Sequence, residues 1–85
     1  MSHMIIAAFR SRMQTMKFFE ALKGRSVSCS IINTPREASI GCGISVKFNE
    51  CDFCAAKAVL SPSYNTFSGF FRTKVKNGAS VTERV

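Results

Sequence analysis

The stretch that decides the fold is Met4–Phe9, which reads MIIAAF. It is a short, nearly uninterrupted apolar run, typical of a strand that is covered on at least one face. Arg10 follows at once, so the run is far shorter than the roughly 18 to 20 apolar residues that a membrane-spanning helix needs. We therefore predict a central strand here and no membrane partner.

Three further segments have the pattern of strands. Residues 27–31 (VSCSI) and 44–48 (ISVKF) alternate between apolar and polar side chains, which predicts one buried and one exposed face for each. Pro35 follows the first of them and stops it, because proline cannot donate a hydrogen bond to a neighbouring strand. A last strand is predicted over residues 66–75, and Gly69 within it indicates a bulge or bend.

The segments between these strands have the spacing of helices. A helix over residues 12–23 is predicted to begin after a Ser11 cap and to end at Gly24. Its apolar stripe, which we expect to face the core, is Met13, Met16, Phe19 and Leu22. A second helix over residues 50–60 follows the capping residue Asn49, and its expected buried stripe is Phe53, Ala56, Val59 and Leu60.

The resulting order is strand, helix, strand, strand, helix, strand. This βαββαβ order predicts an α+β fold, specifically a ferredoxin-like two-layer sandwich with an antiparallel sheet and two helices on one face. A chain of 85 residues has room for one core, so we expect a single domain over residues 4–76. We interpret residues 1–3 as an expression leader and residues 77–85 as a polar C-terminal tail.

The chain is strongly basic, with a formal net charge of +7 and an isoelectric point near 9.8. This balance favours an acidic partner, either a protein or a nucleic acid. The positive side chains are spread from Arg10 to Arg84, unlike those of a nucleic-acid-binding arm. The paired aromatic motifs of RNA-recognition modules are not recognisable, and Gly69-Phe70-Phe71 matches them only weakly. A noncatalytic binding module for RNA or an acidic protein remains the alternative function.

Four cysteines are the candidates for chemistry: Cys29, Cys42, Cys51 and Cys54. No secretory signal is evident, so we interpret them as reduced thiols of a cytoplasmic protein. Their spacing contains one close pair rather than the two of a tetrahedral zinc site, and we expect no metal. Cys29 falls on the apolar side of its predicted strand, which indicates a buried and inert thiol.

Cys42 lies between Gly41 and Gly43, shortly after a proline turn that carries Arg36. The glycines leave room for a partner to approach the sulfur, and the Arg36 guanidinium can stabilise a thiolate. Such a thiolate can accept a sulfane sulfur or selenium atom, hold it as a transient persulfide or selenopersulfide, and pass it on without a bound cofactor. In the alternative interpretation the glycines shape a turn and Cys42 fills a small apolar space.

Cys51 and Cys54 form a Cys-x-x-Cys pair at the start of the second predicted helix. This position is typical of thiols that exchange disulfides, so the pair is a candidate secondary site for redox chemistry or metal binding. Asp52 opposes thiolate formation, however, and Cys54 adjoins the apolar stripe of the helix. Packing is therefore the competing interpretation.

Acid–base and hydrolytic catalysis have little support in the sequence. The chain has only five carboxylates, and Glu50 and Asp52 are explained by favourable charge at a helix start. The single histidine, His3, falls in the expected leader, which leaves Cys42 without the partner that cysteine hydrolases use. A carrier or binding protein is favoured over an enzyme that turns over a small substrate.

The IIAAF run, the motif TPRE at residues 34–37 and the Cys42-Gly43 pair that follows it together resemble the selenium/sulfur carrier-like family of small bacterial proteins. The resemblance extends through Leu60. It implies transfer of sulfur or selenium through Cys42, with donor and acceptor proteins as partners. Cys51, Cys54 and the phenylalanine-rich segment 67–71 depart from the family pattern, which leaves open a second thiol site or a specialised partner surface.

Overall fold

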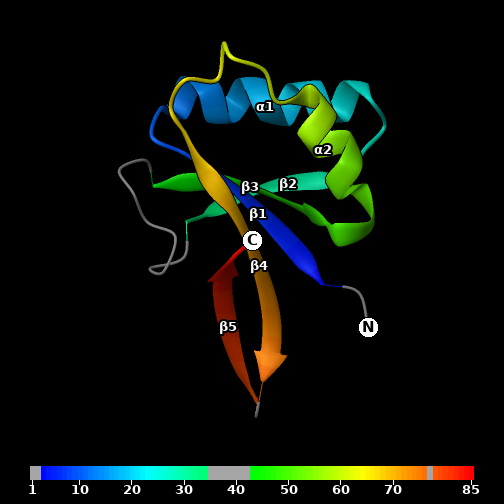
Figure 1. Ribbon diagram of the computed structural model, residues 1–85, viewed down its shortest axis with the longest axis vertical. Coiled ribbons are helices and arrows are strands. Elements are labelled where there is room, and N and C mark those ends of the chain that lie inside the picture. Colours follow the sequence, from blue (N-terminus) through cyan, green and yellow to red (C-terminus); the bar gives the residue numbers. More distant parts are fainter. Residues whose placement is uncertain (1–2, 35–42, 77) are drawn as a thin grey trace.

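A computed structural model of the chain describes residues 3–34, 43–76 and 78–85 (Figure 1). In chain order its elements are β1 (Met4–Phe9), α1 (Arg12–Gly24), β2 (Cys29–Asn33), β3 (Ile44–Asn49), the 3-10 helix η2 (Glu50–Asp52), α2 (Phe53–Val59), β4 (Phe67–Lys76) and β5 (Ala79–Arg84). In this described part, the chain is an α+β protein with a five-stranded antiparallel sheet and two α-helices.

The strand order is β2-β3-β1-β4-β5, so β1 lies at the centre of the sheet and the prediction made from MIIAAF is confirmed. The strand β5 was not foreseen, because its segment was expected to be a polar tail. It pairs with β4 from Phe71 opposite Arg84 to Lys76 opposite Ala79. Gly78 precedes β5 and has a φ of 79°, a left-handed conformation that favours glycine in tight hairpin turns.

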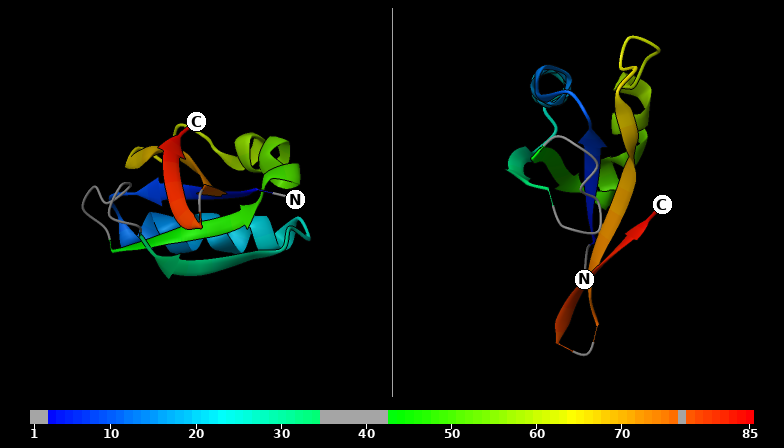
Figure 2. Two further views of the ribbon diagram at one scale, coloured as in Figure 1. Left: turned by 90° about the horizontal axis from the view of Figure 1, so that it is seen from below. Right: turned by 90° about the vertical axis from the view of Figure 1, so that its left-hand side faces the viewer.

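Alternate side chains of β1 belong to two separate clusters. Ile5, Ala7 and Phe9 face the helices, whereas Ile6 and Ala8 face the opposite side of the sheet. Figures 1 and 2 show α1 and α2 together over one face of the sheet. The buried residues of this helix-side core are Ile5, Ala7, Phe9, Phe18, Leu22, Val27, Val46, Phe48, Ala56 and Tyr64. This core holds both helices on the sheet.

The apolar stripe of α1 differs from the predicted one. Met13 is 81% exposed and Met16 is 40% exposed, whereas Phe18 and Leu22 are fully buried. Thr15 is also buried, and its hydroxyl donates a hydrogen bond of 2.9 Å to the carbonyl oxygen of the capping residue. That bond satisfies the hydroxyl and removes most of the cost of burying it. The helix therefore turns a threonine and a phenylalanine toward the sheet in place of two methionines.

The ends of α1 and β2 follow local hydrogen bonding. Ser11 caps α1 as predicted, since its hydroxyl oxygen accepts a hydrogen bond of 3.3 Å from the amide of Gln14. After the helix, the amide of Val27 donates to the carbonyl oxygen of Leu22 at 3.0 Å. Val27 is thus buried in the turn that closes the helix, and β2 begins two residues later than the alternation predicted, at Cys29.

The second helical segment begins as a 3-10 turn rather than as an α-helix. Asn49 caps it, and its side-chain oxygen accepts a hydrogen bond of 3.0 Å from the amide of Cys51. The predicted buried stripe of α2 is confirmed: Ala56 is buried, and Phe53, Val59 and Leu60 pack against the helix-side core. This change of helix type places Cys51 on η2 and Cys54 on α2.

The expected bulge in β4 is confirmed at its start. Ala8 pairs with Gly69 and Phe9 pairs with Phe67, so one extra residue, Ser68, is inserted between them. In a regular strand, Phe67 and Phe70 would point to opposite faces, because side chains alternate. With the bulge, both rings pack against the helix-side core, with their centroids 4.8 Å apart.

The far part of β4 and the strand β5 extend as a hairpin away from the helix layer (Figures 1 and 2). β5 is an edge strand, as is β2 on the other side of the sheet. Neither α-helix in the described part of the chain has the length and apolar character needed to cross a membrane.

Candidate functional site

The residues that flank the predicted carrier thiol are held together by hydrogen bonds. Cys42, Arg36 and Gly41 lie outside the described residues, whereas Thr34 and Gly43 on either side of this segment are described. The amide of Thr34 donates a hydrogen bond of 2.9 Å to the carbonyl oxygen of Gly43. This bond continues the pairing of β2 with β3.

A second contact strengthens the same closure. The hydroxyl groups of Thr34 and Ser45 lie 2.7 Å apart and share a hydrogen bond. Ser45 is fully buried on β3, so the bond fixes Thr34 to the interior of the sheet. We call these two contacts, Thr34 with Gly43 and Thr34 with Ser45, the Thr34 clasp. The clasp therefore fixes the end of β2 next to the start of β3.

The surroundings of Gly43 are open. Gly43 is exposed, and apart from its two chain neighbours no atom of the described residues lies within 4 Å of a Cβ built at this position. Gly43, the residue directly after Cys42 in the chain, has no side chain to fill that space. The role that the sequence suggests for this glycine, access of another molecule to the thiol, stays a prediction, since Cys42 lies outside the described residues.

Cys29 is the only half-buried thiol among the three described cysteines. It lies on β2 against the helix-side core, and its Sγ is 3.8 Å from the carbonyl oxygen of Phe19. Burial raises the pKa of the Cys29 thiol above its ordinary value. A protonated, partly covered thiol is a poor nucleophile, which fits the predicted inert role.

Cys51 and Cys54 are both exposed. The packing interpretation of Cys54 is therefore wrong, since the buried side of α2 passes through Phe53 and Ala56 instead. Phe53 and Cys54 are neighbours in the chain and so project about 100° apart around the helix. The sequence suggested that Cys54 packs with the apolar stripe, and its exposure corrects that; the use of the pair as a site stays a prediction.

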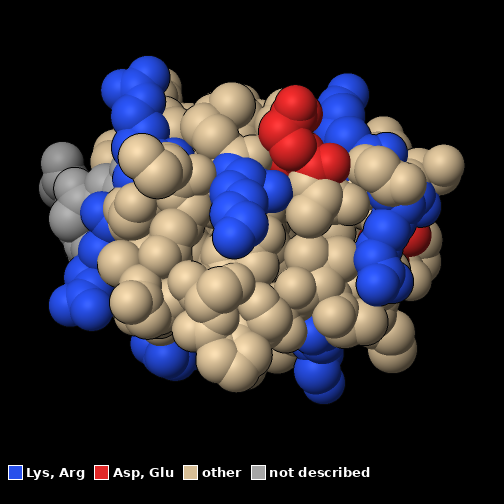
Figure 3. All heavy atoms as spheres, turned by 90° about the horizontal axis from the view of Figure 1, so that it is seen from above, with Lys and Arg blue, Asp and Glu red and all other residues tan. Residues whose placement is uncertain are grey.

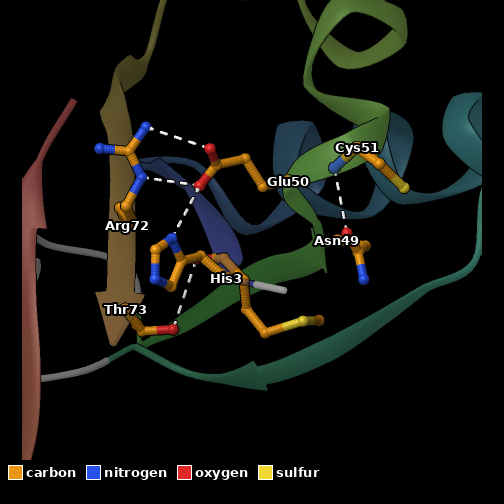
Figure 4. Close-up of polar contacts among 7 residues, drawn as sticks. His3, Asn49, Glu50, Cys51, Arg72 and Thr73 are labelled. Carbon is orange, nitrogen blue, oxygen red and sulfur yellow. Dashed lines mark hydrogen bonds and ion pairs between the residues drawn. The ribbon is translucent and has the colours of Figure 1, made fainter. Parts of the chain in front are cut away.

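A charged contact beside Cys51 was missed by sequence reasoning. Nε of Arg72 donates a hydrogen bond of 2.7 Å to Oε1 of Glu50, and Nδ1 of His3 lies 3.5 Å from the same oxygen (Figure 4). The hydrogen bond from Arg72 lowers the pKa of Glu50 below its ordinary value. The contact ties η2 to β4 across 22 residues of sequence, a pairing that no local pattern reveals.

The basic side chains are spread over the helix-covered side of the molecule. Figure 3 shows this face with its Lys and Arg side chains standing apart from one another rather than merging into one patch. On α1, Arg12 and Lys17 are exposed next to Met13 and Met16. A surface of this kind offers apolar contact together with positive charge.

Among the described residues, no group of three or more His, Cys, Asp and Glu side chains is arranged to hold a metal ion. Near η2, the structure brings together the charged side chains of Glu50, Arg72 and His3, which form an ion-pair contact. Cys51 and Cys54 are two exposed thiols three residues apart in the chain.

Comparison with known proteins identifies the family. No curated protein and no solved structure matches the chain. The family described as Putative Se/S carrier protein-like matches residues 4–72, from the first residue of β1 to the middle of β4. The match covers most of the 85 residues, includes all four cysteines and confirms the resemblance inferred from the sequence. The chain belongs to the Putative Se/S carrier protein-like family.

Proposed function

We propose that this chain is a carrier that accepts a sulfane sulfur or selenium atom on the thiol of Cys42 and passes it to a partner protein. Family membership supports the type of cargo. The observation that carries the choice of site is the Thr34 clasp, because it anchors the chain on both sides of the segment that contains Cys42.

The position of the clasp in the sheet supports access by other proteins. β2 is an edge strand, so the β2–β3 pair lies at the rim of the sheet. A rigid scaffold that ends in a connecting segment is a common way to present a reactive side chain. The open space at Gly43 supports the same role.

The proposed transfer needs no external oxidant or reductant. The Cys42 thiolate attacks the outer sulfur of a donor persulfide, the S–S bond of the donor breaks, and the donor leaves as a thiolate. Cys42 then holds the sulfur as a persulfide. A nucleophile of the recipient attacks that outer sulfur, and Cys42 is released as a thiolate. A selenium atom follows the same steps.

In this proposal, Arg36 stabilises the Cys42 thiolate, and Gly41 and Gly43 leave room for the donor sulfur. Thiols that carry sulfur have to stay reduced between cycles, so we propose a cytoplasmic location. The net charge of +7 favours donor and recipient proteins with acidic surfaces.

Mass spectrometry tests the site directly. After incubation with a cysteine desulfurase and cysteine, the intact chain should gain the mass of one sulfur atom, and peptide mapping should locate it on Cys42. The Cys42→Ser variant should lose this adduct, whereas the matched Cys29→Ser variant should keep it. An undiminished adduct in Cys42→Ser would refute the site.

A noncatalytic binding module is the second candidate function. The exposed Met13 and Met16, with Arg12 and Lys17 beside them, favour it because they combine apolar and positively charged groups on one helix. This function predicts that binding of an acidic protein or RNA weakens as salt is added and survives the Cys42→Ser substitution. Binding that is insensitive to salt would exclude it.

We also infer that β1 to β4 with α1 and α2 form a ferredoxin-like sandwich, to which β5 is added. The strand order β2-β3-β1-β4 and the helices that follow β1 and β3 support this inference. The fold hosts many functions, so it does not by itself favour a carrier over a binding module.

A further inference from the structure

Two exposed thiols on one side of a short helical segment need an explanation. Cysteine is among the residues most often buried in proteins. Cys29 is half-buried, whereas Cys51 and Cys54 are both exposed. Among the described residues, neither of these two thiols has a hydrogen bond or ion pair. Packing and local bonding therefore do not account for them.

The helical geometry brings the two side chains together. Cys51 lies on η2 and Cys54 lies on α2, which follows without a break. Side chains three residues apart are neighbours on a helix, with Cβ atoms about 5–6 Å apart, and in a 3-10 turn they nearly eclipse. A disulfide needs Cβ atoms about 3.5–4.5 Å apart. A shift of about 1–2 Å thus joins the two sulfurs.

Access to the pair is open on the outer side of the helix. Figure 4 shows the Cys51 side chain pointing away from the Glu50–Arg72 contact. The amide of Cys51 is already bonded to Asn49, so the turn is held by its backbone while the thiol is left available. The buried side of α2, which includes Ala56, belongs to the helix-side core and contains neither thiol.

We propose that Cys51 and Cys54 form a second thiol site, which takes a sulfane sulfur or selenium atom from a persulfide and releases it as sulfide or selenide while the pair closes to a disulfide. This rests on the proposed function for the natural source of the persulfide. It lets the carrier release its cargo as free sulfide or selenide, in addition to the direct transfer from Cys42 to a recipient.

The chemistry balances in two steps. One thiolate of the pair attacks the outer sulfur of the donor persulfide, and the donor leaves as a thiolate. The second thiolate then attacks the inner sulfur of the new persulfide, the outer sulfur leaves as hydrosulfide, and the Cys51–Cys54 disulfide forms. The sulfane sulfur is reduced and the two thiols are oxidised. A dithiol reductant returns the pair to its starting state.

Glutathione persulfide is a suitable probe, since it supplies sulfane sulfur without a donor enzyme. The full chain, freed of reductant and kept without oxygen, should release sulfide and form a Cys51–Cys54 disulfide in equal amounts. Either Cys51→Ser or Cys54→Ser should reduce sulfide release by about tenfold or more, and one of them should trap the persulfide on the remaining thiol. The matched Cys29→Ser variant should behave like the unchanged chain.

Sulfide release that is unchanged in both single variants would overturn the proposal. So would the absence of a Cys51–Cys54 disulfide after equilibration of the unchanged chain in a glutathione redox buffer, because the sulfurs would then be unable to meet. The Cys42→Ser variant separates the two hypotheses. With glutathione persulfide, this variant should still form the Cys51–Cys54 disulfide, because the pair takes sulfur from the probe directly. If the pair does not form a disulfide, the result of loading the unchanged chain with desulfurase is unaffected.

Discussion

Two neighbouring residues of β1 show how differently the two faces of the sheet are supported. Ile5 and Ile6 are 0% and 1% exposed, yet they belong to separate clusters. On the helix side, residues from β1, β3, α1 and α2 meet in one core. On the opposite side, Ile6, Ala8 and Phe71 form a small buried cluster, with the guanidinium of Arg84 over the Phe71 ring at 5.8 Å. Equal burial thus does not mean equal packing.

Matched substitutions of the two isoleucines give the largest expected effect. We expect Ile5→Ala to cost about 4 kcal/mol of unfolding free energy and Ile6→Ala about 2 kcal/mol, since fewer neighbours surround the second cavity. Urea denaturation followed by circular dichroism measures both. Equal losses would show that the opposite face is packed as tightly as the helix side.

A substitution at Gly69, in the bulge of β4, is the next test of how the two sides of the sheet are packed. A Cβ on Gly69 would lie 2.9 Å from Nη2 of Arg84, which donates a hydrogen bond to the carbonyl oxygen of Ser68. Gly69 also has a φ of 149°, so we expect Gly69→Ala to cost about 1–3 kcal/mol.

Gly24 is the control for this substitution. Nothing lies within 4 Å of a Cβ built there, so Gly24→Ala should be neutral or slightly stabilising in the same denaturation experiment. A Gly69→Ala variant as stable as Gly24→Ala would mean that the Arg84 side chain moves aside freely.

Thiol alkylation compares Cys29, which packs against the helix-side core, with the exposed thiols of Cys51 and Cys54. Burial raises the pKa of Cys29, and its sulfur lies against the helix-side core. Iodoacetamide should therefore modify Cys29 at least about tenfold more slowly than Cys51 or Cys54 near pH 8, as read by peptide mass spectrometry. In denaturant the three rates should converge. Similar rates in the folded chain would contradict the protection of Cys29.

The smallest expected effect concerns the ion pair between Glu50 on η2 and Arg72 on β4. The folded-state pKa of Glu50 lies below its ordinary value of 4.5, so the stabilisation by Arg72 is fully present above that pH and is lost as the pH falls through the folded pKa. Glu50→Gln should be less stable than the unchanged chain at pH 7, and the difference should shrink in acid.

A double-mutant cycle checks that assignment. Arg72→Gln should remove the same pH-dependent part of the stability. Combining it with Glu50→Gln should lower the stability little further than Glu50→Gln alone. Thermal unfolding of the four chains at pH 7 and pH 3 provides the comparison. A difference between Glu50→Gln and the unchanged chain that grows in acid would give the opposite sign and refute the ion pair.

The candidate sites were predicted from the sequence and stay predictions. The Cys-x-x-Cys spacing indicated Cys51 and Cys54, and the Pro35 turn with its two glycines indicated Cys42. The exposure of Cys54 was not readable, because a residue beside an apolar stripe can turn to either side of it. The Thr34 clasp was also missed, since a threonine at a strand end does not reveal its partner across the sheet.

The sequence by itself determined the central strand at MIIAAF, the extent and cap of α1, the buried stripe of α2 and the bulge near Gly69, because these features depend on residues close together in the chain. Only the tertiary structure decided that α1 buries Phe18 instead of Met13, that the C-terminal segment pairs with β4, and that Glu50 meets Arg72. Each of these depends on contacts between distant residues. Local periodicity indicates which apolar side chains share one side of a helix, whereas the shape of the rest of the core determines which of them become buried.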